Sequence, residues 1–123
     1  MRRIRIAWRA GEVLAELKNT PTASKLLAEL PCRASANTWG EEVYFSLPFA
    51  ARLEPGAQQV VDAGTVCYWV EGSSLALPFG PTPVSKGNEC RLVTRCNVLG
   101  RIAGDPSKLK TVRDGDEIRV EAA

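Results

Sequence analysis

The 123-residue chain contains no histidine. This absence excludes Ser-His-Asp and Cys-His catalytic arrangements and any imidazole proton shuttle. It also excludes the many zinc sites that use histidine ligands. Acid–base chemistry in this protein would have to use carboxylates, lysine, tyrosine or cysteine.

A strong net charge and long apolar runs are absent as well. The chain has 16 Lys and Arg against 14 Asp and Glu, a net charge of +2, which is too small by itself to indicate a nucleic-acid or membrane partner. No apolar run approaches the roughly 20 residues of a membrane-spanning helix, and no apolar signal segment follows the basic N-terminus. The arginines near that end (Arg2, Arg3, Arg5 and Arg9) have few aromatic neighbours, which favours protection of a strand edge over nucleic-acid binding. We therefore expect a cytoplasmic protein without nucleic-acid or membrane partners.

The four cysteines show none of the short C-x-x-C spacings typical of zinc or thioredoxin-like sites. They are Cys32, Cys67, Cys90 and Cys96. Reducing conditions in the cytoplasm favour free thiols, although Cys90 and Cys96 could close a small loop as a disulfide. A four-cysteine metal site is less favoured still. We therefore expect neither a metal nor a cofactor.

The length suits a single domain over residues 1–123, and the hydrophobic pattern is mostly that of β-strands. Residues 3–9 alternate strictly, which places Ile4, Ile6 and Trp8 on one face, and a turn at residues 10–12 leads to a second strand at 13–17. Further strands are predicted at residues 42–47, 65–70, 75–79, 96–103 and 117–121. Pro78 would make the strand at 75–79 an edge or bulged strand.

One amphipathic helix is predicted between these strands. Thr20 is a suitable N-cap and Pro21 suits the first helical position, while Pro31 ends the helix. Its apolar stripe consists of Ala23, Leu26, Leu27 and Leu30. A single capped turn is predicted at residues 105–109. About eight short strands with these two helices predict a mainly β fold, a closed or nearly closed eight-stranded antiparallel barrel.

The run NTWGEEVYFSLP at residues 37–48 is the best candidate for a binding site. Tyr44 has the opposite parity to Val43 and Phe45, so it faces outward if they face the core. We expect an apolar groove with Trp39, Tyr44 and Phe79 as walls and Asn37, Thr38 and Glu41 as polar anchors. The alternatives are that Trp39 caps the core and that residues 79–83 form a rigid loop without a ligand. Glu41 and Glu42 point to opposite strand faces, so they cannot act together on one reacting atom. We expect both to be solvated turn residues.

Four segments together carry a resemblance to a known family. They are NTWGEEVYFS at residues 37–46, GTVCYW at 64–69, FGPTP at 79–83 and NVLGRI at 97–102. In this order and spacing the chain resembles the small cyclophilin-like family of bacteria and archaea, an atypical branch of the cyclophilin fold. The resemblance covers nearly the whole chain. It implies an eight-stranded antiparallel barrel with helices near its ends.

The resemblance implies less about activity. Cyclophilins are peptidyl-prolyl isomerases whose site places an arginine, in a Phe-His-Arg segment, near the prolyl nitrogen. In this chain the corresponding segment, residues 43–48, contains neither His nor Arg, and Arg52 is not at the motif position. We therefore assign no catalytic residues. We expect a monomer or weak homodimer that binds a small molecule or a peptide, and the alternative hypothesis is a divergent peptidyl-prolyl cis/trans isomerase.

Overall fold

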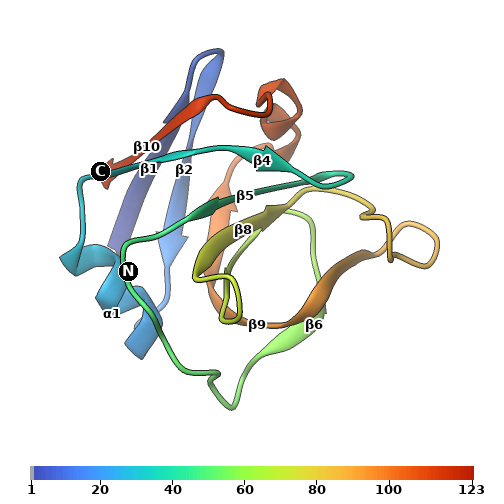
Figure 1. Cartoon of the computed structure of the whole chain (residues 1–123), viewed down its shortest axis with the longest axis horizontal. Helices are drawn as coiled ribbons and strands as arrows, with labels where there is room; N and C mark the ends of the chain where they lie inside the picture. Colours follow the sequence, from blue (N-terminus) through green and yellow to red (C-terminus); the bar gives the residue numbers. More distant parts are fainter. Residues whose placement is uncertain (1) are drawn as a thin grey trace.

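The structure is a computed structural model that describes residues 2–123, so Met1 lies outside it. Figure 1 shows a strongly curved sheet with α1 at one end and the 3-10 helix η1 at the other. The helices are α1 (Pro21–Ala28) and η1 (Pro106–Thr111). The strands are β1 (Arg2–Trp8), β2 (Gly11–Leu17), β3 (Cys32–Ser35), β4 (Asn37–Thr38), β5 (Glu42–Ser46), β6 (Gln58–Val61), β7 (Thr65–Trp69), β8 (Ser74–Pro78), β9 (Cys90–Ala103) and β10 (Glu117–Ala122).

All strand pairs are antiparallel. The order is β3-β10-β1-β2-β9-β7-β8-β5-β4, and β6 pairs with β9. A mainly β antiparallel fold with two helices is thus confirmed. The expected number of eight strands is corrected to ten, since β3, β4 and β6 carry too little apolar alternation to be recognised in the sequence. In the part of the chain that is described, pairing follows an open path from β3 to β4.

The N-terminal hairpin has the faces that its alternation predicts. Ile4, Ile6 and Trp8 are buried in the main core. The turn lies at residues 9–10, and β2 begins at Gly11. Trp8 Nε1 donates a hydrogen bond to Thr111 Oγ1 at 2.8 Å, which attaches the hairpin to η1. The Trp8 indole is therefore fixed within the main core.

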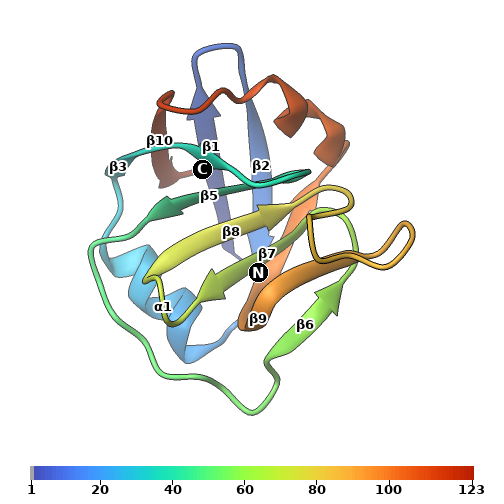
Figure 2. The same cartoon turned by 45° about the vertical axis from the view of Figure 1, so that its right-hand side comes forward.

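Helix α1 forms as predicted and covers one end of the sheet, as Figure 2 shows. Thr20 Oγ1 accepts from Ala23 N–H at 3.1 Å, and Pro21 occupies the first turn. Below the helix, the side chain of Asn97 is fully buried. Its amide donates to Thr22 Oγ1 at 2.9 Å and to the Arg52 carbonyl at 2.8 Å. Its oxygen accepts from Glu54 N–H at 2.7 Å, so one side chain joins α1, the segment after β5 and strand β9.

Strand β9 is longer than the sequence predicts and is the element that builds the site. Its C-terminal half pairs with β2 and β7, and its N-terminal half pairs with β6. At Gly100 a Cβ would lie 2.0 Å from the Glu16 carbonyl oxygen, so only glycine allows the strands to approach here. Cys90 and Cys96 lie on this one strand rather than on a loop, and both are free thiols.

The curvature of β9 gives the sheet two apolar layers. Val43, Phe45, Leu75 and Leu77 belong to the main core. A second cluster lies on the opposite face of β5, β7 and β8 and consists of Val61, Cys67, Ala76, Cys90, Leu92 and Cys96. Strand β8 lies between β5 and β7, so the prediction that Pro78 marks an edge strand is wrong. Pro78 is the last residue of its strand.

Candidate functional site

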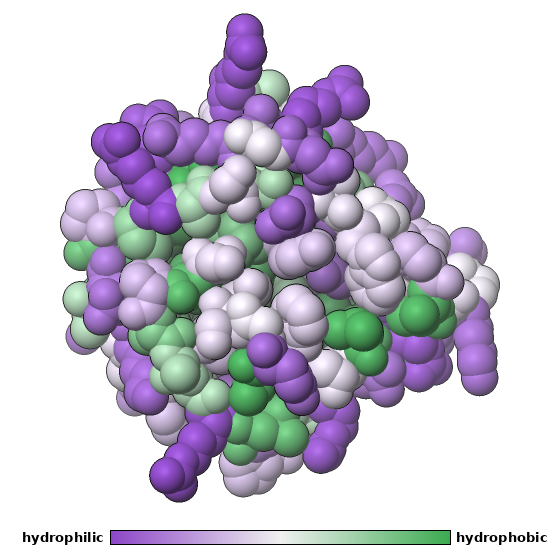
Figure 3. Space-filling model, viewed as in Figure 1, coloured by the Kyte–Doolittle hydropathy of each residue, from purple (hydrophilic) through white to green (hydrophobic). Residues whose placement is uncertain are grey.

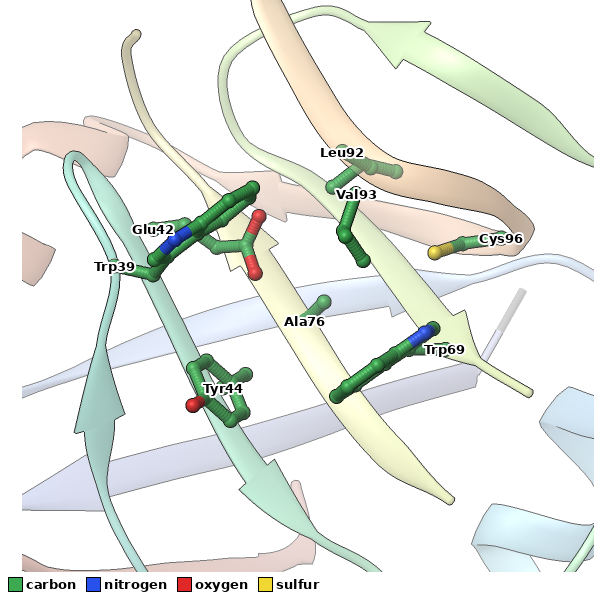
Figure 4. A pocket seen from close by; sticks show the side chains of 8 residues that line it. All are labelled: Trp39, Glu42, Tyr44, Trp69, Ala76, Leu92, Val93 and Cys96. Atoms are coloured by element: carbon green, nitrogen blue, oxygen red, sulfur yellow. The ribbon is translucent and has the colours of Figure 1, made fainter. Parts of the chain in front are cut away.

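A cavity of about 200 Å³ opens in the second apolar layer. Figure 4 shows side chains from β5, β7, β8 and β9 and from the turn before β5 converging on it. Its lining consists of Trp39, Glu42, Tyr44, Trp69, Ala76, Leu92, Val93 and Cys96. Figure 3 shows the face of the molecule seen in Figure 1. Hydrophilic residues lie mainly around its periphery, and paler or apolar residues lie toward its middle. The cavity is thus a mostly apolar hollow with one carboxylate.

Strand parity places the cavity where it is. Glu42 and Tyr44 alternate with Val43 and Phe45, which face the main core, so their side chains enter the second layer. In the strand register Tyr44 is opposite Ala76, and Ala76 is opposite Cys67. The alanine methyl is the smallest side chain in that row. It forms the floor of the cavity because it leaves space between its larger neighbours.

Trp39 is held in place by the loop that follows β8. Trp39 N–H donates to the Glu42 carbonyl at 3.0 Å, and Glu41 N–H donates to the Pro81 carbonyl at 2.9 Å. Gly40 has φ +59, and a Cβ there would lie 2.8 Å from Pro83 Cδ. A glycine is therefore required for this turn to pack on the loop. Trp39 is half-buried and lies outside both core clusters, so it forms a wall of the cavity rather than a cap on the core.

Trp69 and Tyr44 form a corner of the cavity. Their ring centroids are 6.0 Å apart and their planes are perpendicular, an edge-to-face arrangement. Trp69 also lies directly over Gly72, where a Cβ would come within 2.3 Å of the indole carbons. The missing side chain at Gly72 therefore fixes the position of this indole.

Gly72→Ala is expected to displace the Trp69 ring and lower the free energy of unfolding by about 2 kcal/mol, since overpacking costs about 1–3 kcal/mol. The shift of the Trp69 indole N–H resonance and urea denaturation measure the two effects. Gly56→Ala is the control, because a Cβ at Gly56 meets nothing within 4 Å. Equal effects of the two substitutions would contradict the assigned contact.

Among the described residues that line the cavity, Glu42 alone has a carboxyl group, and it is 6% exposed. Its Oε1 is buried and receives no hydrogen bond within residues 2–123. Burial raises its pKa from 4.5 to about 7, because the charged form loses its hydration without gaining a partner. The expectation that Glu42 is a solvated turn residue is therefore wrong. Strand parity carries its side chain into the second layer instead.

Burial disfavours the thiolate form of the cysteines near this carboxylate. Burial is the main cause that raises the pKa of Cys96 to about 12, and the charge of Glu42 adds to it. Burial also raises the pKa of Cys67 and Cys90. Since the thiolate is the reactive form, nucleophilic chemistry is not favoured here. Within residues 2–123, no group of three or more Cys, Asp or Glu side chains is arranged to hold a metal ion.

Two of the six predicted site residues, Trp39 and Tyr44, come together in the cavity. Thr38 is directed elsewhere, because its N–H and its hydroxyl both donate to Asp114 Oδ1, at 2.7 and 2.8 Å. Asn37 is exposed and donates to the Tyr44 carbonyl at 3.4 Å. Glu41 lies against Gly80, and Phe79 packs against the main core. Roles of these four residues in binding stay predictions.

Sequence reasoning missed six residues that line the cavity: Glu42, Trp69, Ala76, Leu92, Val93 and Cys96. The parity of Glu42 with Tyr44 was a usable signal, since an outward Tyr44 implies that Glu42 lies on the same face. Neighbouring strand residues point to opposite faces, so only one of Tyr68 and Trp69 can face the core, and the sequence does not say which. The structure resolves it: Tyr68 is fully buried and donates to the Phe49 carbonyl at 2.7 Å, while Trp69 faces the cavity.

The fold agrees with what the chain is similar to. Residues 2–121 match the model of a family described as cyclophilin-like, and the chain belongs to the cyclophilin-like family. A solved relative is the hypothetical protein AF2241 from Archaeoglobus fulgidus, whose solution structure matches with a TM-score of 0.84 and 35% identity over 99% of this chain and 95% of that one. No curated protein matches the chain. Neither helix of the described chain has the length and apolar character to cross a membrane.

Proposed function

We propose that the protein is a binding module that holds a small molecule or a peptide side chain in the cavity beside Trp39. The observation that carries the proposal is an aromatic-walled hollow in which a buried carboxylate oxygen, Glu42 Oε1, has no hydrogen-bond partner among the described residues. Sites for small ligands are mostly apolar with few placed polar groups, and the lining has that composition. The volume of about 200 Å³ is below the roughly 300–1,000 Å³ of drug-sized sites, so the occupant is a small compound or one side chain.

Trp39→Ala and Tyr44→Ala are expected to abolish binding and to preserve the fold, because both side chains are half-buried walls of the cavity. The measurement is a ¹H–¹⁵N NMR screen with small amines, amides and carboxylic acids as probes. The indole N–H of Trp69 should shift on binding, while that of Trp8, bonded to Thr111 in the main core, should not. Val84→Ala, at an exposed loop position, is the control variant. Full binding by both aromatic variants would refute the proposal.

The alternative, a divergent peptidyl-prolyl isomerase, has only the family resemblance in its favour, and a fold does not establish an activity. No arginine lines the cavity within the described residues, and Arg52 is exposed and outside the lining. A proline-isomerisation assay on a short peptide separates the two hypotheses. A rate above background that Trp39→Ala removes would favour the isomerase.

We also propose that the protein acts as a monomer or weak homodimer without nucleic-acid or membrane partners.

We propose as well that the strands form a closed barrel. The two ends of the strand path, β3 and β4, are separated by Ala36 alone. Ala36 N–H donates to the Asp116 carbonyl and its own carbonyl accepts from Gly115 N–H, both at 2.9 Å. These bonds hold the residue between β3 and β4 against the residues before β10. They therefore support a barrel that closes between β3 and β4.

A further inference from the structure

The unpartnered carboxylate of Glu42 indicates what kind of ligand the cavity takes. Figure 4 shows this carboxylate directed into the hollow beside Trp39. A buried carboxylate without a partner is costly, and a ligand that brings a positive charge recovers that cost. The lining offers no Lys or Arg within residues 2–123, so the positive charge has to come from the ligand.

The aromatic walls favour the same sign of charge. Trp39, Tyr44 and Trp69 surround the space next to Glu42. The faces of such rings attract cations, and aromatic cages bind methylated ammonium groups in this way. A second unpartnered atom, Trp69 Nε1, requires an acceptor such as a hydroxyl oxygen. The walls therefore suit an organic cation that also carries an oxygen.

The titratable groups around Glu42 disfavour an anionic ligand. The carboxylates that act on this layer besides Glu42 are Glu41, Asp62 and Glu71, and all of them are negative when ionised. The thiols of Cys67, Cys90 and Cys96 add no charge, because burial raises the pKa of each. Arg91 on β9 is already paired, since its Nε lies 2.5 Å from Glu89 Oε2. Arg95 on the same strand is exposed. The local field thus attracts cations.

We propose that the cavity binds a methylated ammonium group, with Glu42 as its counter-ion and Trp39, Tyr44 and Trp69 as its aromatic walls. The proposal rests on the proposed binding function and names its ligand class. At about 30 Å³ per water-sized group, a cavity of about 200 Å³ holds about seven non-hydrogen atoms, which is the size of choline. A trimethyl-lysine side chain carries the same group within a peptide.

The test compares choline with 3,3-dimethylbutan-1-ol, its uncharged isostere, by NMR titration at pH 5.5 and pH 8.5. Choline is expected to bind about tenfold more tightly than the isostere at pH 8.5. The charge of choline does not change with pH. Burial raises the pKa of Glu42 to about 7, so this carboxyl ionises between the two pH values, and the affinity for choline should rise with it. A short peptide with a central trimethyl-lysine distinguishes a side chain from a free compound as the source of the group, and tighter binding of either cation supports the proposal.

Glu42→Gln is the decisive variant. It should lose about tenfold in choline affinity and the pH dependence, yet retain binding of the isostere, which a collapsed cavity would not do. Glu29→Gln, at an exposed position after α1, should change nothing. If the isostere binds as tightly as choline, the ligand class is overturned and the binding function stands. If neither probe nor the peptide binds, the ligand class is overturned, and the screen with amines, amides and carboxylic acids decides whether the binding function stands.

Discussion

Replacing Glu42 with glutamine is expected to raise the free energy of unfolding at pH 8 by about 3 kcal/mol and to leave it nearly unchanged at pH 4. The reason is that burial raises the pKa of Glu42 in the folded protein to about 7, from 4.5. Below pH 4.5 this carboxyl is protonated in both states. Between the two pKa values the unfolded chain releases the proton while the folded protein keeps it. Stability therefore falls as pH rises through this window, and an uncharged glutamine removes the fall.

Urea denaturation at pH 4, 6 and 8 measures this difference between the wild type and Glu42→Gln. Other groups titrate equally in both proteins, so the difference between the two curves isolates Glu42. Glu29→Gln, an exposed carboxyl, is the matched control and should follow the wild type at every pH. Parallel profiles of the wild type and Glu42→Gln would mean that Glu42 is hydrated in the folded protein. A group that lowers stability in this way is typical of a functional site.

Asn97→Ala is expected to lower the free energy of unfolding by about 3 kcal/mol at neutral pH. Asn97 is completely buried, and its side chain makes three hydrogen bonds, to Thr22, Arg52 and Glu54. Alanine leaves the Glu54 N–H and the Arg52 carbonyl without these partners in a partly buried place, and it leaves a cavity. Both effects add to the cost.

Thermal or urea denaturation measures the loss, with Asn88→Ala in the exposed loop as the control. Binding of a probe in the cavity should survive at temperatures where the variant remains folded, because Asn97 lies under α1 and not in the lining. A loss below about 0.5 kcal/mol, the usual range for surface substitutions, would contradict the network.

The first half of the fold could be predicted because its sequence signals are local. The alternation of Ile4, Ile6 and Trp8 and the capped start of α1 at Thr20 depend only on near neighbours. The second apolar layer could not be predicted in this way. Strand β8 is buried over all five residues, so it shows no alternation, and β9 is recognisable only in its second half.

The candidate site was predicted in part for the same reason. Trp39 and Tyr44 lie on the segment 37–48, where an aromatic pattern and a turn glycine are visible in the sequence. Leu92 and Cys96 reach the cavity only because β9 curves over β7 and β8, a long-range contact that periodicity does not encode. The burial of Glu42 could not be predicted either, because a strand end next to a turn is ordinarily solvated. It is the second apolar layer that buries this side chain.

The most direct test of the account is the ionisation of Glu42 itself. A ¹³C NMR titration of its side-chain carboxyl, assigned by comparison with Glu42→Gln, would follow this group in the free protein and with saturating choline. A midpoint near pH 7 is expected in the free protein, and it should move to lower pH when choline is bound, since a cation stabilises the carboxylate. A midpoint near 4.5 that choline does not change would contradict it.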